Sequence, residues 1–361
     1  MDIIFYGPLG SNIPKERVGG AETGCKRSIA ILEKSGYDVR VVEKPTTFYG
    51  MKKFLLDFHR AVQELKLLFK QNPQAVFYLV GFYDRQICFE YYLCRMALKY
   101  GLKYIYEPKN GAMIWKYNEG NILYKNLSDY IFSHASVIFC QGIEYKVFLN
   151  NKGLNNAVYH PNYINKNNLE YYTGKKGDVP TFIYVGRVTQ SKNIELILEI
   201  FSRFYSKHGE AKLYVVGGGV DNEYKEKLKK CEKTLGVENA VTFTGRLDFA
   251  EIANYLNQSH FFLFPSAERF EGHSNSVTEA MAFGVIPIAS TIGFNASVIG
   301  DKRLLVSGYE ANDYATIALS IWENDEFYIL SDQVRQRALD KFSEDTVKNE
   351  YISNIRCINV D

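Results

Sequence analysis

Cysteine is scarce in this sequence of 361 residues, and its spacing suits neither a disulfide framework nor a zinc site. The six cysteines are scattered without a C-x-x-C pair, which is typical of reduced thiols in the cytosol. The six histidines form no H-x-H or H-x-x-x-H pair, and no D-x-D motif occurs. We therefore expect no metal site.

Long apolar runs are missing as well. No stretch reaches the ~18 uninterrupted apolar residues that a membrane-spanning helix needs. The first ten residues, MDIIFYGPLG, lack the basic region and long apolar run of a signal peptide and are typical of a strand. We expect a cytoplasmic protein, with peripheral contact at the cytoplasmic membrane face as the open alternative.

Charge is unevenly distributed along the chain. Residues 1–160 carry 21 basic and 14 acidic residues, whereas the remainder carries 22 basic and 27 acidic residues. This asymmetry indicates either an anionic partner for the first half, such as a membrane surface or a phosphorylated acceptor, or an ordinary lysine-rich surface. We expect no nucleic-acid partner.

Apolar strands and amphipathic helices alternate along both halves of the chain, which predicts α/β domains with parallel sheets. At ~100–200 residues per domain the length suits two such domains. The Asn-, Gly- and Lys-rich segment between the halves reads as a linker. We expect two Rossmann-like, doubly wound domains that face a central cleft, because such folds bind ligands at the carboxyl ends of their strands. The predicted divisions are residues 1–160, a linker at 161–180, a second domain at 181–343 and a final helix at 344–361.

Cations and glycines follow three strands of the second domain. In VGRVTQSKN (185–193), Arg187 and Lys192 flank a loop that leads into a helix. Together with the helix N-terminus the two cations suit a diphosphate, whereas either residue alone could be an ordinary surface residue. In VVGGG (215–219), the glycines allow close approach of a ligand or a tight turn. VTFTGRL (241–247) ends with Gly245 and Arg246 at the same expected edge, where backbone groups could read a nucleobase.

The stretch ERFEGHSNSVTEAMAFG (268–284) places two carboxylates, Glu271 and Glu279, around the start of a helix. Ser274, Asn275 and Ser276 are candidate N-cap residues. The backbone N–H groups of such a helix suit a phosphate, and carboxylates suit hydroxyl groups. A sugar nucleotide has both parts.

Four motifs, FIYVGRVTQSKN, LYVVGGG, VTFTGRL and FLFPSAERFEGHSNSVTEAMAFGVIPIAS, closely resemble the second domain of GT-B glycosyltransferases of family 4. These are retaining enzymes with an E-x7-E motif. In the first half, VGGAETGCKRSIAILEKSGYDVRVV is similar to the family's Gly-Gly loop and first helix. The ending FSEDTVKNEYISNI is similar to the helix that crosses back onto the first domain.

The resemblance implies a role for each matching residue. Arg187 and Lys192 would hold the diphosphate, Glu279 the ribose hydroxyls and Glu271 the hydroxyls of the donor sugar, with no metal or other cofactor. Further donor contacts are implied for His273, Ser274, Asn275, Ser276, Gly19, Gly20, Gly217, Gly218, Gly219 and Arg246.

The sequence departs from the family pattern at three places. His273 replaces an aromatic residue, and added residues before Glu271 make Glu268 a competing carboxylate. EPKNG (107–111) lacks the histidine that many members place after the fourth strand, so Lys109 and Asn110 are candidates for a contribution from the first domain. We expect His134 to be structural.

The implied function is retaining transfer of a sugar, from a UDP-hexose or a UDP-N-acetylhexosamine, to a glycan or lipid-linked acceptor in cell-surface polysaccharide synthesis. The open alternatives are a non-catalytic sugar-nucleotide-binding protein and a GT-B epimerase. The predicted helix 51–71 is amphipathic and lysine-rich; its apolar stripe either packs on its own sheet or touches anionic lipid. That stripe comprises Phe54, Leu55, Phe58, Val62, Leu65 and Leu68.

Overall fold

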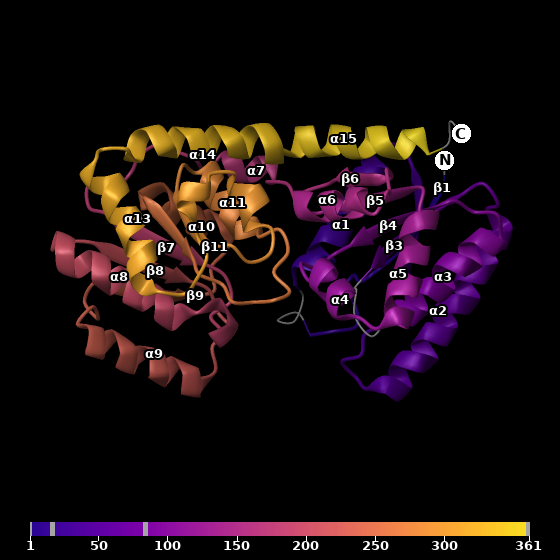
Figure 1. The fold of residues 1–361 in the computed structure, drawn as a ribbon, viewed down its shortest axis with the longest axis horizontal. Coiled ribbons are helices and arrows are strands. Elements are labelled where there is room, and N and C mark those ends of the chain that lie inside the picture. The colour runs from indigo at the N-terminus through magenta and orange to yellow at the C-terminus, as the bar shows by residue number, and fades with distance from the viewer. Residues whose placement is uncertain (1, 15–18, 82–85, 359–361) are drawn as a thin grey trace. The chain divides into compact units, whose positions relative to one another are not determined.

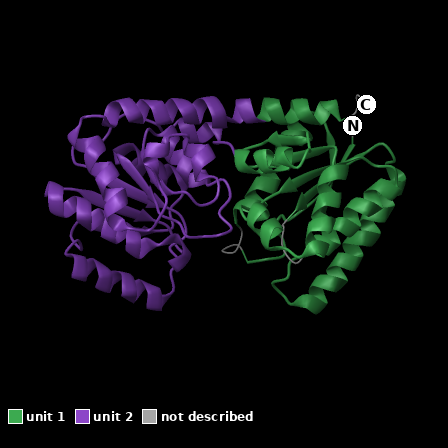
Figure 2. Cartoon of the chain, viewed as in Figure 1, with its two compact units in different colours: residues 1–161, 348–361 green, residues 162–347 purple. Residues whose placement is uncertain are grey.

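The computed structural model describes residues 2–14, 19–81 and 86–358 and divides the chain into two compact units. The first unit comprises residues 1–161 and 348–361, and the second comprises residues 162–347 (Figure 2). Residues 359–361 of the expected final helix lie outside the described residues.

The first unit is a parallel sheet of six strands in the order β2-β1-β3-β4-β5-β6, with helices on both faces (Figure 1). The central strands are mostly apolar and are buried on both faces, as is usual in parallel sheets. The strands are β1 (Asp2–Gly7), β2 (Asp38–Glu43), β3 (Val76–Gly81), β4 (Tyr104–Pro108), β5 (Val137–Cys140) and β6 (Ala157–Tyr159). The helices are α1 (Gly20–Lys34), α2 (Met51–Gln71), α3 (Ile87–Lys99), α4 (Met113–Glu119), α5 (Ile122–His134) and α6 (Ile143–Asn151).

The second unit is also a six-stranded parallel sheet, in the order β12-β11-β10-β7-β8-β9. Its strands are β7 (Thr181–Val185), β8 (Lys212–Val216), β9 (Val241–Gly245), β10 (Phe261–Phe264), β11 (Ile286–Ser290) and β12 (Leu305–Val306). Its helices are α7 (Lys166–Leu169), α8 (Ile194–His208), α9 (Asn222–Leu235), α10 (Phe249–Gln258), α11 (Asn275–Ala282), α12 (Asn295–Ile299), α13 (Ala311–Glu323) and α14 (Phe327–Phe342), with 3-10 turns η2 (Gln190–Lys192) and η3 (Lys302–Leu304). The predicted α/β class with two doubly wound parallel sheets is confirmed.

The last helix, α15 (Glu344–Cys357), starts in the second unit and contributes its residues from Lys348 onward to the first. Tyr351 anchors it there, because its ring stacks on His160 at 4.4 Å and lies 4.9 Å from Phe139. Tyr351 is 1% exposed. Through Tyr351, the part of the helix from Lys348 onward belongs to the core of the first unit.

Local signals explain where helices begin and which faces they bury. The segment between β4 and β5 forms two helices, α4 and α5, because Asn121 accepts a hydrogen bond from Tyr124 N at 2.9 Å and starts a new helix. On α2, Phe54, Val62 and Leu65 are buried, so packing on the sheet accounts for these members of its stripe. Leu55 is 47% exposed. No helix in the described ranges is both long and apolar enough to cross a membrane.

Candidate functional site

The carboxyl edge of the second sheet has its switch point between β7 and β10. The chain runs from β7 to β8 on one side, whereas β10 pairs with β7 on the other. Loops that leave such neighbouring strands diverge to opposite faces and open a crevice. The loops after β7 and β10 carry Lys192 and Glu271.

Lys192 and Glu271 form an ion pair at this switch point. Ser266 Oγ donates to the same carboxylate oxygen, Glu271 Oε2, at 2.8 Å. The lysine and glutamate side chains are 10% and 12% exposed. The Lys192 ammonium also lies 5.5 Å from the centre of the Phe264 ring. A cation and a carboxylate are therefore held together in a mostly water-excluded place.

Two hydrogen bonds, one between backbones and one from a side chain to a backbone, tie the two loops to each other. Ala267 N donates to Ser191 O at 3.0 Å, and Asn193 Nδ2 donates to Pro265 O at 2.9 Å. Asn193 adopts a left-handed conformation with φ of 54°, which asparagine tolerates better than most residues. Lys192, the last residue of η2, thereby faces the loop after β10.

Buried polar side chains at the end of β11 and the start of α12 support the loop that carries Glu271. Asn295 Nδ2 donates to Ser290 O at 2.9 Å, and Ser290 Oγ donates to Ser266 O at 2.8 Å. Gly293 lies against Glu271 so closely that an added Cβ would fall 2.4 Å from Glu271 O. The sequence motifs do not point to Ser266, Ser290, Gly293 or Asn295. Polar residues at the ends of β10 and β11 were the signal that could have indicated this part of the site.

Helix α11 begins at Asn275, shortly after Glu271 in the chain, and its N-cap side chain makes no capping hydrogen bond. Ser274 is the N-cap residue, and its hydroxyl lies 3.2 Å from Ser276 Oγ without making a capping hydrogen bond. The N–H groups of the first turn have no partner within a helix, and the helix dipole adds positive potential there. Asn275 and Ser276 are in this turn, and the half-buried Glu279 follows on the same helix. The start of α11 suits an anion.

The first glycine after β8, Gly217, has a packing role and also lines a pocket. Gly217 has φ of 151°, and an added Cβ would fall 1.7 Å from Gly186 O, so no other residue fits. An added Cβ at Gly218 would lie 3.5 Å from Arg246 Cβ, whereas Gly219 has nothing within 4 Å. A pocket of about 240 Å³ opens beside these loops. Its lining includes Val188, Gly217, Val220, Phe243 and Gly245.

Arg187 and Glu268 are placed at the margin of the pair. Arg187 is exposed, and its carbonyl accepts from Tyr184 OH at 2.8 Å. Burial, with a smaller contribution from Glu271, raises the pKa of Tyr184. The hydroxyl therefore keeps its proton and its hydrogen bond to the loop. Glu268 Oε1 accepts from Phe270 N at 3.4 Å within its own turn.

His273 turns its ring into the unit. The ring packs edge-on against Phe342 at 5.1 Å, and the residue is 5% exposed. Its carbonyl accepts from Asn162 Nδ2 at 3.0 Å. The side chain thus joins the loop to α14, and only its backbone remains near the start of α11.

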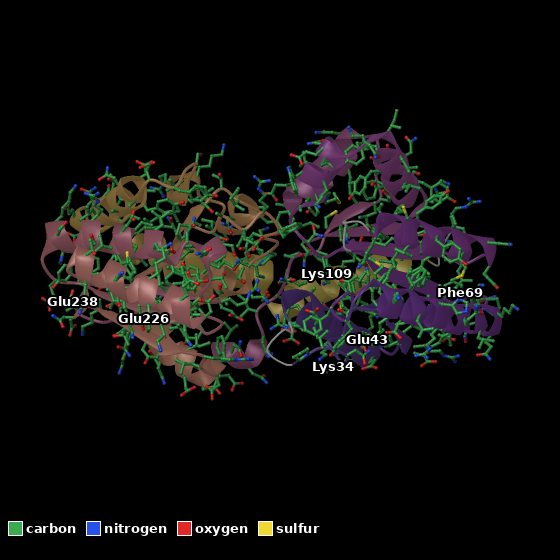
Figure 3. The ribbon with its side chains drawn as sticks, turned by 90° about the horizontal axis from the view of Figure 1, so that it is seen from below. Lys34, Glu43, Phe69, Lys109, Glu226 and Glu238 are labelled. Atoms are coloured by element: carbon green, nitrogen blue, oxygen red, sulfur yellow. The ribbon has the colours of Figure 1, made fainter. Side chains whose placement is uncertain are left out.

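The candidates of the first half lie in the first unit. Gly19 and Gly20 start α1, and Glu22 Oε2 accepts from Gly19 N at 2.9 Å. Lys109 (Figure 3) is paired with Glu107 at 2.6 Å, with side chains 3% and 0% exposed.

Two other residues of the first half make local contacts. Asn110 Oδ1 accepts from Ala112 N at 2.9 Å. The exposed His134 stacks on Tyr130 at 4.1 Å on α5. In the described part of the chain, no group of three or more His, Cys, Asp and Glu side chains could hold a metal ion.

Known sequences resemble the second half of the chain most clearly. Residues 165–340 match the family described as Glycosyl transferases group 1. The chain is similar to alpha-monoglucosyldiacylglycerol synthase of Streptococcus pneumoniae, with 28% identity over 166 residues, 45% of this chain and 36% of that protein. Matches to curated relatives cover between 25% and 47% of their lengths.

Solved structures resemble the whole chain. Sucrose-phosphate synthase from Thermosynechococcus elongatus aligns with a TM-score of 0.74 and 15% identity, covering 99% of this chain and 98% of that one. Anabaena HepE in complex with UDP aligns with a TM-score of 0.73 and 13% identity, covering 99% and 100%. The HepE complex with UDP-glucose aligns with a TM-score of 0.68. The chain therefore has the GT-B fold.

Proposed function

We propose that this chain, which has the GT-B fold and matches the glycosyl transferases group 1 family at residues 165–340, is a retaining, metal-independent glycosyltransferase of family 4. The observation that carries the proposal is the Lys192–Glu271 pair beside the uncapped start of α11. A cation, a carboxylate and unpartnered N–H groups are the set that a nucleotide sugar needs.

In the proposed reaction, Lys192 and Arg187 stabilise the charge that develops on the departing diphosphate. The N–H groups of Asn275 and Ser276 bind its oxygens, Glu271 accepts hydrogen bonds from the donor sugar, and Glu279 accepts them from the ribose. The pocket beside Gly217 and Gly245 would take the nucleobase.

The step is a single exchange at the anomeric carbon. The acceptor hydroxyl oxygen forms a bond to that carbon, and the bond from the carbon to the diphosphate oxygen breaks. The departing diphosphate oxygen takes the proton of the acceptor hydroxyl. Attack and departure therefore take place on the same face of the sugar, and the anomeric configuration is retained.

We further propose a UDP-hexose or UDP-N-acetylhexosamine as donor. The fold shared with HepE, which was solved with UDP and with UDP-glucose, supports this choice. A glycan or lipid-linked acceptor, in cell-surface polysaccharide synthesis, is proposed in part because the similar synthase from Streptococcus pneumoniae is named for a diacylglycerol product. Peripheral membrane contact at the cytoplasmic face, through α2, belongs to the same proposal.

Two alternatives make different predictions for the same site. A GT-B epimerase needs an acid/base histidine in the site, and the ring of His273, the histidine beside Glu271, instead packs on Phe342. A non-catalytic sugar-nucleotide-binding protein would bind the donor but release no nucleotide. The packing of the His273 ring favours transfer over epimerisation. A measurement of donor turnover distinguishes transfer from binding alone.

Thermal unfolding with UDP, GDP, ADP and their sugars tests the donor. A ligand that binds the folded state at 100 times its Kd stabilises it by about 2.7 kcal/mol. We expect UDP and a UDP-sugar to raise the melting temperature in the presence of EDTA. The anomeric configuration of the product, read by NMR, then tests retention. A nucleotide series without any shift, or an inverted product, would overturn the proposal.

A further inference from the structure

A basic groove of about 450 Å³ lies in the first unit, where the end of α1 meets α15. The polar residues that line it include Lys34 (Figure 3), Ser35, Lys348, Asn349, Ser353 and Arg356. Helix α1 follows the carboxyl end of β1 and ends just before β2 begins, so its last residues lie at the amino edge of the parallel sheet. Folds of this kind bind their substrates at the opposite, carboxyl edge. The basic groove is therefore separate from the substrate edge of this unit.

Both walls of the basic groove are fixed by packing and hydrogen bonds. On α1, Leu32 is fully buried, and its carbonyl accepts from Ser35 N at 3.0 Å where the helix ends. On α15, Ile352 lines the groove and is buried against the first unit. Lys103 Nζ donates to Ile358 O at 2.7 Å, which holds the chain just after the last turn of α15. The polar side chains of the groove therefore start from fixed backbone positions.

Three cations from the two helices line the groove. Lys34 and Arg356 are exposed, and Lys348 is half-buried. Lys348 and Arg356 are separated by two helical turns of α15, so their Cα atoms lie about 12 Å apart along the helix axis. Like charges that converge on one place repel each other, and an anion that contacts all three relieves this repulsion. The span along α15 exceeds the size of one phosphate group and suits a longer anion.

Neutral donors accompany the cations along the groove. Asn349 and Ser353 are one turn apart on the α15 wall, and Ser35 is on the α1 wall. A hydroxyl group and an amide N–H group can each donate a hydrogen bond to a phosphate oxygen. An arginine guanidinium binds phosphate with two parallel hydrogen bonds, and a lysine ammonium has three donors. The groove thus offers hydrogen-bond donors of the kind that linked phosphate groups accept from.

We propose that the basic groove is a second anion site, which binds a ligand with two or more linked phosphate groups. Lys348 and Arg356 contact phosphate groups at the two ends of the ligand, and Lys34 reaches it from α1. The ligand is a polyphosphate group, either free in solution or carried by a lipid. The site is independent of the proposed function, because the proposed donor residues Lys192 and Glu271 belong to the second unit.

Isothermal titration calorimetry of the full chain tests the groove with inorganic tripolyphosphate, pyrophosphate and orthophosphate. UDP is present in excess, so that the proposed donor site is occupied during each titration. We expect the Kd of tripolyphosphate to be at least tenfold lower than that of orthophosphate, with pyrophosphate between them. Added sodium chloride should weaken the binding, because exposed charges are screened by salt. Equal affinity for tripolyphosphate and orthophosphate, or no binding of any of them, overturns the proposal.

Charge-neutral variants locate the binding. The groove variant combines Lys34→Gln, Lys348→Gln and Arg356→Gln, and glutamine keeps a polar side chain that suits a helix. Its Kd for tripolyphosphate should rise at least tenfold, and that of Lys34→Gln alone at least threefold. The matched control removes three exposed lysine charges from the second unit, with Lys207→Gln, Lys230→Gln and Lys233→Gln.

The control should keep the wild-type Kd for tripolyphosphate. An equal loss of affinity in the groove variant and the control would show that only net charge matters, and it would overturn the proposal. Circular dichroism of the groove variant excludes misfolding as the cause of a loss. If UDP does not bind, the donor proposal fails, whereas the contrast between the groove variant and the control still decides on the groove.

Alkylation of cysteine locates the ligand in the wild-type chain. Cys357 lines the groove, and Cys88, on α3, is exposed as well. We expect tripolyphosphate to slow the reaction of Cys357 with iodoacetamide at least threefold and to leave that of Cys88 unchanged, as read by mass spectrometry of peptides. Slowing of both cysteines, or of neither, contradicts a ligand in the groove.

A competition experiment separates the two sources of the polyphosphate group. Phosphatidylcholine vesicles that contain a long-chain alkyl diphosphate are added to the complex of the full chain with tripolyphosphate. Release of tripolyphosphate by these vesicles, and not by pure phosphatidylcholine, identifies a lipid headgroup as the ligand. Retention of tripolyphosphate identifies a soluble ligand. Either result supports the site, and release by pure phosphatidylcholine contradicts recognition of phosphate groups by the three cations.

Discussion

Lys192 Nζ and Glu271 Oε2 are paired across the switch point of the second sheet, so each charge is balanced before a ligand arrives. The pair reaches its place through two different loops, one after β7 and one after β10. A diphosphate that approached Lys192 would compete with Glu271 for its ammonium protons. A donor sugar beside Glu271 would compensate the carboxylate with hydroxyl protons, so the complete donor suits the pair better than a free diphosphate does.

Removing both members of the pair should cost less stability than the two single substitutions cost together. Lys192→Met leaves the Glu271 carboxylate without its cation, and we expect a loss of about 2 kcal/mol in the free energy of unfolding. The double variant Lys192→Met, Glu271→Gln should be less destabilised than the sum of its single variants, because neither charge remains. Urea unfolding of the four proteins measures the coupling.

The same variants test the donor site. Both single variants should lose the increase in melting temperature given by UDP-glucose. Glu271→Gln should keep more of the increase given by UDP alone than Lys192→Met does. Equal and additive stability losses would show that the ion pair contributes no coupling. A normal rate of transfer in Glu271→Gln would remove this residue from the mechanism.

Gly293 should be as important to Glu271 as any direct partner. It has φ of 65°, and an added Cβ would fall 2.4 Å from Glu271 O and 3.0 Å from Glu271 Cβ. Gly293→Ala must therefore both strain the backbone and displace the loop that carries the carboxylate. We expect a lower kcat with an unfolding free energy about 1 kcal/mol below that of its control.

Gly209→Ala is that control. Gly209 has φ of 88°, and nothing lies within 4 Å of an added Cβ, so alanine there has only the backbone cost of about 1–2 kcal/mol. Steady-state kinetics on a donor and acceptor pair identified by turnover would separate the two. The same kcat in both variants would show that the contact with Glu271 does not matter.

The contrast between Glu271 and its supports shows what sequence can predict. The spacing of Glu271 and Glu279 and the loop after β7 could be recognised because each motif is contiguous in the chain. Ser290 at the end of β11, Gly293 in the loop after it and Asn295 at the start of α12 support the Glu271 loop directly or through Ser266, and only the folded sheet brings them there. The sequence likewise offers His273 as an open site residue, whereas Phe342, distant in the chain, covers its ring.

The α/β class was predictable for a related reason. Alternating apolar strands and amphipathic helices depend on local pattern, and the structure confirms two parallel sheets. The strand order within each sheet depends on which strand edges pair, and the local sequence pattern does not determine this pairing. The switch point between β7 and β10, which positions the Lys192–Glu271 pair, is visible only in the fold.

Helix α2 should carry any contact with a membrane surface. Met51 and Leu56 are 60% and 53% exposed at its start, and Leu67 is 60% exposed further along. The exposed cations Lys52 and Arg60 accompany them. We expect the full chain to float with vesicles that contain phosphatidylglycerol and not with pure phosphatidylcholine, because basic amphipathic helices need anionic lipid.

Substitution on this helix tests the contact. Leu56→Ser with Leu67→Ser should reduce the floated fraction at least fivefold. Ile329→Ser, which removes a side chain 64% exposed in the second unit, should leave it unchanged. Salt at high concentration should release the wild type, since the attraction is electrostatic. Flotation with neutral vesicles, or none with anionic ones, contradicts a peripheral contact of this kind.

Acid should destabilise the second unit through His260. Burial lowers the pKa of His260 to about 4, and Lys176 adds to the effect. Its Nδ1 accepts a hydrogen bond from Thr181 N at 3.1 Å, which protonation of that nitrogen would break. Between pH 6.5 and about 4 the unfolded chain therefore binds a proton that the folded unit does not, and stability falls as pH falls. The full loss is about 3 kcal/mol.

The two tryptophans make this measurable one unit at a time. Trp322 lies 5.0 Å from His260 in the second unit, and Trp115→Phe leaves it as the single tryptophan reporter. In that background, the free energy of unfolding measured in urea should fall steadily from pH 6.5 to pH 4 in the parent. It should fall much less in His260→Asn, which keeps an acceptor for Thr181 N. His208→Asn, at an exposed position, is the control. Burial lowers the pKa of Lys176 to about 7, so its contribution changes only above this range, where stability rises with pH. An unchanged pH slope in His260→Asn would show that another group carries the acid sensitivity.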